Sequence, residues 1–174
     1  LGSSSNVYSG NGKYYLPYKT GLAFEVIQGE TGTLSHFGNN LYALDFGMPE
    51  GTELTACRSG TVVAFKEDSN EGGPDLETYK DKANYIWILH DDGSIGYYFH
   101  LKQNGVLVNL GQKVKTGDVI GLSGNTGFST TPHLHLQVVM PRGFAGFDNI
   151  PIRFKGINGA LQEGSSYTAT SVAN

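Results

Sequence analysis

Short runs of apolar and aromatic residues, separated by turn residues, fill the middle of the chain. The runs are rich in β-branched and aromatic residues and are bounded by turn sequences such as Asp91-Asp92-Gly93. None shows a sustained helical period. We therefore expect an all-β, antiparallel domain with little or no helix, and we place strands over residues 42–46, 53–56, 60–66, 85–90, 95–100, 119–121 and 133–139.

The two ends of the chain differ in composition from its middle. Residues 1–13 are rich in Ser, Gly and Asn, and residues from about 156 are rich in Gly, Ser and Thr. We expect a flexible N-terminal tail over 1–13, one domain over 14–155 and a peripheral C-terminal tail over 156–174. The chain begins at Leu1 without a signal peptide, so we expect a mature or trimmed form.

Charge and cysteine content exclude some classes of protein. The net charge of -4 gives no electrostatic reason to expect a nucleic-acid partner. No apolar stretch is long enough to span a membrane. Cys57 is the only cysteine, so no intramolecular disulfide can form, and we expect it to be a small buried hydrophobic residue.

The segment 67–82 carries six acidic residues against two lysines. A calcium-binding loop is one reading, but the spacing does not match the EF-hand pattern. Charge runs are usually solvated, so we expect a surface loop, and long loops of this kind often border a binding groove.

Histidines supply the strongest chemical signal. His133 and His135 lie two residues apart in a strand-like run, where alternate side chains point to the same face, roughly 7 Å apart at the backbone. Leu134 and Leu136 then face the core. One protonated imidazole disfavours protonation of its neighbour, and a metal ion would favour a neutral ring as its ligand.

Asp45 lies inside an otherwise apolar run, where an unpaired carboxylate would be costly. A metal ion is one possible partner, and an arginine or backbone donor is another. Two histidines and one aspartate form a common catalytic zinc set that leaves the fourth position for water. The residues alone do not decide between a zinc site and structural histidines, nor which of His133 and His135 binds.

The ordered motifs resemble those of the LytM/lysostaphin-type metallopeptidases, peptidase family M23, over roughly residues 33–140. Most specific is the His-x-His strand preceded by a Gly-Asn-Thr-Gly turn and an upstream His-Leu pair. The segments that carry the resemblance are His36, 42–52, 60–62, 83–86, 90–93, 98–101, 111–118, 124–127 and 132–135.

The resemblance implies a role for each matching histidine and for the aspartate. His36, Asp45 and His135 would be the metal ligands, and His133 and His100 would be catalytic. The family usually has its aspartate four residues after the first histidine, where this chain has Asn40. We place a short insertion there and keep Asp45 as the ligand, because neutral amides are poor zinc ligands.

The resemblance also implies the fold and the activity. We expect a sheet groove of the LytM/duplicated-hybrid-motif type that holds one Zn²⁺ ion. The enzyme would be a metalloendopeptidase that hydrolyses peptidoglycan peptides, in the cross-bridge or the stem. We expect extracytoplasmic action, no membrane span and a monomer.

Three alternatives remain beside this interpretation. The first is a non-catalytic M23-like binding or activating module, although all five family positions are filled. The second is a biotinyl/lipoyl or phosphotransferase carrier, which residues 111–121 resemble but which leaves His36 and Asp45 unexplained. The third is a structural β-domain with incidental histidines, which leaves the same-face pair beside the acid unexplained. We expect His90, which precedes an Asp-Gly turn, to be structural or at the surface.

Overall fold

The regular secondary structure of the computed structural model consists mostly of strands, and the model describes residues 10–32, 35–36 and 38–172. Its helices are the single turn α1 (Leu76–Tyr79) and the 3-10 turns η1 (Gly38–Asn40) and η2 (Gly143–Ala145). In the part of the chain described, no helix has the length and apolarity to cross a bilayer. The strands are β1 (Gly10–Tyr14), β2 (Ala23–Gln28), β3 (Leu44–Gly47), β4 (Glu53–Thr55), β5 (Gly60–Lys66), β6 (Gly72–Gly73), β7 (Tyr85–Leu89), β8 (Ile95–Phe99), β9 (Leu101–Val106), β10 (Lys113–Val114), β11 (Val119–Ser123), β12 (Gly127–Phe128), β13 (His133–Pro141), β14 (Phe147–Ile150), β15 (Ile152–Phe154) and β16 (Ser166–Thr168).

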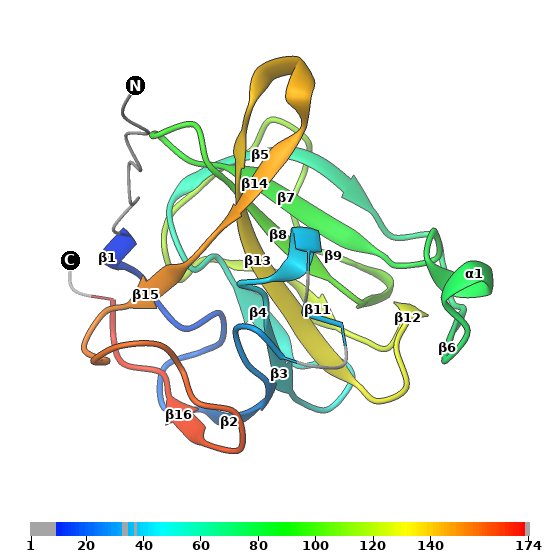
Figure 1. The fold of residues 1–174 in the computed structure, drawn as a ribbon, viewed down its shortest axis with the longest axis horizontal. Coiled ribbons are helices and arrows are strands. Elements are labelled where there is room, and N and C mark those ends of the chain that lie inside the picture. The colour runs from blue at the N-terminus through cyan, green and yellow to red at the C-terminus, as the bar shows by residue number, and fades with distance from the viewer. Residues whose placement is uncertain (1–9, 33–34, 37, 173–174) are drawn as a thin grey trace, which may run out of the picture.

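One nine-stranded sheet forms the centre of the molecule. Its strands follow the order β10-β5-β7-β8-β13-β3-β2-β16, and β14 pairs with the far end of β13. Figure 1 shows the labelled strands in this order from β5 at the top to β16 at the bottom. Every pairing within this sheet is antiparallel, which confirms the expected fold class.

One face of the sheet packs into the apolar core. Leu134 and Leu136 on β13 have no more than traces of exposed surface, as do Tyr98 on β8 and Ile86 on β7. They are cross-strand neighbours: Leu136 pairs with Tyr98, and Tyr98 pairs with Ile86. Strand alternation therefore turns the intervening residues, including His133 and His135, to the opposite face.

That opposite face carries a row of aromatic side chains. Phe99 pairs with His135 on one side and with Tyr85 on the other. In the next row, Trp87 stacks on Tyr97, with ring centroids 4.5 Å apart. We call Tyr85, Trp87, Tyr97 and Phe99 the aromatic row. It extends across the sheet from His135, and single-strand patterning did not predict it.

Both ends of the expected domain extend further than the sequence indicated. β1 begins at Gly10, within the expected tail, and pairs in parallel with β15. β16 adds an edge strand beside β2, and Leu161 and Ala169 are buried in the core. Residues 1–9 of the expected tail lie outside the described residues. The segment 156–172 is attached to the core by a strand and buried side chains.

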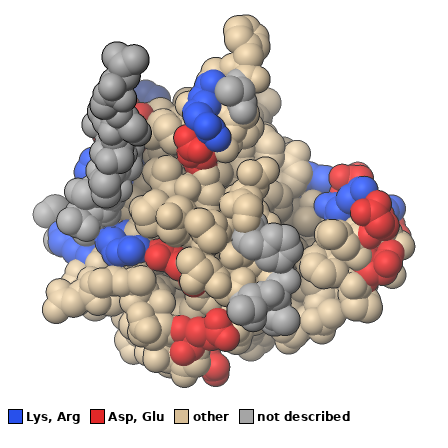
Figure 2. Space-filling model, in the orientation of Figure 1, with Lys and Arg blue, Asp and Glu red and all other residues tan. Residues whose placement is uncertain are grey.

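The acidic segment 67–82 lies at the surface, as expected. Its charges form exposed pairs such as Lys82 with Glu71 and Lys80 with Glu77, and Figure 2 shows blue and red side chains side by side at the right of the view. It is more ordered than a simple loop, because it contains α1 and because β6 pairs with β12. The buried Asn84 side chain holds Ser69 at both its N–H and its carbonyl.

Cys57 is fully buried beside the equally buried Tyr98. The Tyr98 hydroxyl donates to Cys57 Sγ at 2.9 Å and accepts from the Cys57 N–H at 2.9 Å. Burial raises the pKa of the Cys57 thiol to about 11. We therefore expect no reaction of the folded protein with a thiol reagent such as dithiobis(2-nitrobenzoate) at pH 8. The thiol of the unfolded chain should react fully. Rapid labelling of the folded protein would contradict this packing.

Candidate metal centre

The pairing of β3 with β13 places Asp45 directly opposite His135. The two residues are 90 positions apart in the chain, and His135 Nδ1 lies 2.9 Å from Asp45 Oδ1. Both side chains are buried. An antiparallel register that sets the two leucines of β13 into the core thus also sets this histidine beside the carboxylate.

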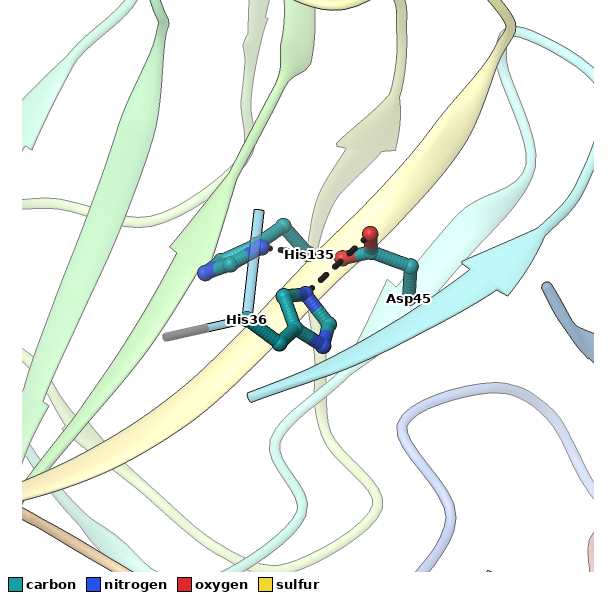
Figure 3. Close-up of side chains that lie close together, drawn as sticks. All are labelled: His36, Asp45 and His135. Carbon is teal, nitrogen blue, oxygen red and sulfur yellow. Dashed lines mark hydrogen bonds and ion pairs between the residues drawn. The ribbon is translucent and has the colours of Figure 1, made fainter. Parts of the chain in front are cut away.

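His36 approaches the same carboxylate from the segment before η1. Its side chain is fully buried, and Nε2 lies 3.2 Å from Asp45 Oδ2. Its other nitrogen, Nδ1, lies 2.8 Å from the Gly29 carbonyl oxygen. Figure 3 shows the rings of His36 and His135 on the same side of Asp45, with one oxygen of its carboxylate bonded to each ring.

The hydrogen bonds identify which ring atoms carry lone pairs. A carbonyl oxygen only accepts, so His36 donates to Gly29 from Nδ1 and holds a lone pair on Nε2. That lone pair faces a carboxylate oxygen, and two acceptors at this distance repel unless a proton or a cation lies between them. The arrangement therefore favours bound positive charge.

The donor set fits a divalent metal such as zinc. One atom from each of His36, Asp45 and His135 lies within 4.8 Å of the others. Within the described ranges, no second group of three His, Cys, Asp or Glu side chains has this arrangement. Two imidazole nitrogens and a carboxylate are a donor set of catalytic zinc sites, and three protein ligands leave one position open.

The pKa values of the two ion-paired groups shift in opposite directions. Burial would raise the pKa of Asp45, but His135, His36 and His133 outweigh it and lower the pKa well below its usual range. Burial would lower the pKa of His36, but Asp45 and the Gly29 carbonyl raise it. Both shifts show a site that holds a negative charge and attracts a positive one.

His133 lies beside this cluster but is held differently. Its Nδ1 lies 2.8 Å from the Thr131 carbonyl, so it donates there and leaves a lone pair on Nε2. Nε2 is 3.8 Å from Asp45 Oδ1, farther than the corresponding His36 and His135 nitrogens. Burial lowers the pKa of His133, so the ring is neutral and can accept a proton at pH 7.

His100 faces His133 across the site, with ring centroids 4.6 Å apart. The residue does not continue β8 as expected from the sequence, because it adopts a φ of 67° between β8 and β9. Non-glycine residues rarely take this conformation, and such residues often cluster at functional sites. Burial, and then the nearby His133 and His135, lower the pKa of His100 to about 3.

A turn glycine supports the position of His100. His100 Nδ1 donates to the Thr126 carbonyl at 2.6 Å, and Thr126 precedes Gly127. Gly127 has a φ of 84°, and a Cβ there would lie 2.5 Å from the Ala83 side chain. The Gly-Asn-Thr-Gly turn therefore needs glycine at its last position to present the carbonyl that orients His100.

The structure separates His90 from the site. Its side chain is buried, Nδ1 lies 2.9 Å from the Ser59 carbonyl, and its ring meets the edge of Tyr14. This histidine is structural and is not at the surface. Asn40 ends η1 and accepts the Ala43 N–H at its carbonyl.

Comparison with known proteins identifies the family. The profile described as peptidase family M23 matches residues 39–144, which is more than half of the chain. The chain belongs to peptidase family M23. The match to this M23 domain includes Asp45, His100, His133 and His135, and it begins three residues after His36.

The M23 domain is similar in sequence to two named endopeptidases. It is 39% identical over 101 residues to the glycyl-glycine endopeptidase ALE-1 of Staphylococcus capitis, a match covering 58% of this chain and 25% of the relative. It is 38% identical over 96 residues to the peptidoglycan DD-endopeptidase ShyA of Vibrio cholerae, covering 55% of this chain and 19% of the relative. The M23 domain thus spans about a quarter or less of each relative.

A solved structure supports the fold. The antimicrobial peptidase lysostaphin from Staphylococcus simulans matches the M23 domain with a TM-score of 0.52 and 28% identity, covering 80% of this chain and 51% of that one. The all-β architecture derived above is therefore shared with a known peptidase of this type.

The sequence left two features of the site unidentified. Phe99 packs its ring edge against His135, with centroids 5.8 Å apart, and so joins the aromatic row to the metal centre. The carbonyls of Thr126 and Thr131, which orient His100 and His133, were also not identified. The dipeptide Thr-Pro before His133 and the Gly-Asn-Thr-Gly turn were the signals that could have indicated these carbonyls.

Proposed function

We propose that this M23 domain is a zinc-dependent endopeptidase that cuts the peptides of bacterial peptidoglycan. One observation supports the proposal above all: in an M23 chain, two imidazoles and a carboxylate place one ligand atom each within 4.8 Å of one another. The ligands of a single zinc ion would be His36, Asp45 and His135. His133 and His100 would be the catalytic histidines.

Zinc held by these residues would supply Lewis-acid chemistry, polarising a substrate carbonyl and making water more acidic. The protein's own contribution is the placement of proton acceptors. His133 presents the lone pair of Nε2 toward the cluster because Thr131 holds the proton on Nδ1. It would accept the proton of the attacking water and hold it as an imidazolium.

His100 would assist His133 from the opposite side. Its low pKa keeps it neutral at pH 7, with Nδ1 donating to Thr126 and the Nε2 lone pair free. A neutral ring there can accept a hydrogen bond from water or from His133 once the latter is protonated. The positive charge of protonated His133, held in place by its hydrogen bond to His100, would then stabilise negative charge that develops on the substrate carbonyl oxygen.

The named relatives cut two kinds of peptide bond, between glycines and in D,D-linked peptides. We propose a peptidoglycan peptide of one of these kinds as the substrate, and action outside the cytoplasm by a monomer. The aromatic row beside His135 would form part of the substrate-binding face, since it continues the sheet face that carries the site.

Metal removal tests the proposal. We expect about one zinc per chain in a chelator-free preparation. Removal by phenanthroline should abolish cleavage of both a glycine oligomer and a D,D-cross-linked peptide, and stoichiometric zinc should restore it. Metal content is measured by mass spectrometry and cleavage by the appearance of new amino groups. A protein that holds zinc but cleaves neither peptide would instead be the non-catalytic module, and a protein without zinc would refute the ligand assignment.

A further inference from the structure

A cavity of about 780 Å³ lies far from the metal centre. It opens where β10 and β5 meet the end of β7, at one edge of the nine-stranded sheet. Strands β7 and β8 separate β5 from β13, which carries the site histidines. The proposed peptidase reaction does not use this cavity.

Basic residues dominate the charge of its lining. Lys13, Lys113, Lys115 and Arg58 line it, against one acidic residue, Asp91. The chain as a whole is acidic, with a net charge of -4. A local concentration of positive charge in an acidic protein needs an explanation.

The three lysines differ from most basic residues of the protein in having no ion-pair partner. Over residues 10–32, 35–36 and 38–172, five lysines form no ion pair, and three of these five line the cavity. Of the other two, Lys155 lies over the Tyr15 ring and Lys102 is on β9. Ion pairs occupy the remaining basic side chains: Lys19, Arg58, Lys66, Lys80, Lys82, Arg142 and Arg153.

The wall of the cavity is held rigidly by contacts among its own residues. Arg58 bonds to Asp91 and Asp92, so it fixes the wall, and its single positive charge is more than offset by these two carboxylates. The Ser59 and Thr116 hydroxyls lie 3.1 Å apart and tie the β4–β5 connection to the β10–β11 turn. A Cβ on Gly60 would lie 2.4 Å from the Leu89 carbonyl oxygen, so the backbone there is closely packed.

We propose that this cavity binds phosphate groups, through the ammonium groups of Lys13, Lys113 and Lys115. An ammonium is a compact charge with three donors and suits a tetrahedral oxyanion approached from several sides. The Thr61 hydroxyl, and whichever of the Ser59 and Thr116 hydroxyls does not donate to the other, add short-range donors at the same lining. The volume falls in the range of small-ligand sites, which leaves room for a phosphate with its substituent. The phosphate could be a free ion or part of a phosphodiester polymer.

Titration of the isotope-labelled protein with inorganic phosphate, glycerol 3-phosphate and poly(glycerol phosphate) tests the proposal. The amide signals of Lys113, Lys115 and Thr116 report binding by nuclear magnetic resonance. We expect saturable shifts of these signals. The affinity for phosphate should fall as salt rises from about 20 to 150 mM, because dissolved ions screen the attraction between the phosphate and the lysines. Polymer binding about tenfold tighter than glycerol 3-phosphate would identify the polymer as the source, and equal binding would identify the small ion.

Three variants decide whether the cavity is responsible. Lys113→Gln with Lys115→Gln should weaken phosphate binding by about tenfold or more. Lys13→Gln, on a different strand, should also weaken phosphate binding. A local defect in one hairpin would then not explain the loss in both variants. Lys102→Gln removes one positive charge, as Lys13→Gln does, but lies outside the lining, and it should have less than about a twofold effect. Equal losses in all variants, or no saturable shifts with any of the three ligands, would overturn the proposal. Peptidase activity should be unchanged in all three variants, which separates this proposal from the proposed function.

Discussion

Replacing His133 with alanine is expected to lower kcat/KM for peptide cleavage by about 10² to 10⁴-fold while leaving about one zinc per chain. The reason is that His133 offers a proton-accepting nitrogen but lies farther from Asp45 than the two proposed ligands, with its other nitrogen bonded to Thr131. Cleavage is measured on the peptide that the wild type cuts, and zinc by mass spectrometry of the same sample.

His36→Ala is the matched comparison for His133→Ala. Both changes remove a buried imidazole next to Asp45, but the His36 nitrogen lies 3.2 Å from the carboxylate and the His133 nitrogen 3.8 Å. We expect His36→Ala to lose both zinc and activity. Loss of zinc from His133→Ala would show that His133 is a ligand, and retained activity would remove it from the catalytic pair.

Replacing Asp45 with asparagine is expected to weaken zinc binding by more than about 100-fold, beyond the effect usual for outer-shell partners. The substitution keeps the shape of the side chain but removes the charge that the surrounding histidines stabilise. A competition titration against a fluorescent zinc chelator measures the change.

Asn40→Ala is the control for Asp45, because Asn40 occupies the usual family position of the aspartate. We expect its zinc affinity to match that of the wild type within about twofold, since a neutral amide is a poor zinc ligand. A loss of zinc from Asn40→Ala with retention in Asp45→Asn would reverse the assignment and remove the inferred insertion.

Much of the sheet could be predicted from the sequence because its strands are short runs rich in β-branched and aromatic residues, and the start of β13 alternates between polar and apolar residues. The run around Leu134 and Leu136 forms β13 with its leucines in the core. The same alternation places His133 and His135 on one face of the strand. Local pattern was sufficient here, since the period of a strand alone determines which residues share a face.

Features that depend on contacts distant in the sequence could not be predicted. The register that sets His135 opposite Asp45 arises from pairing across 90 residues. This register determines that His135 lies closer to Asp45 than His133 does. The left-handed turn at His100 depends on the Thr126 carbonyl and on the close approach at Gly127. The parallel pairing of β1 with β15 likewise joins opposite ends of the chain. The acidic segment gave no local sign of β6, because its partner β12 is distant in sequence.

The pairing of β3 with β13 also has a consequence for how the protein folds. Asp45 and His135 meet only after a loop of 90 residues has closed, and closing long loops is entropically costly and slow. The unfolded chain therefore has no preformed set of three ligands that could bind a metal tightly. Zinc would bind only after the central strands have paired. Bound zinc would therefore lower the unfolding rate and leave the folding rate unchanged.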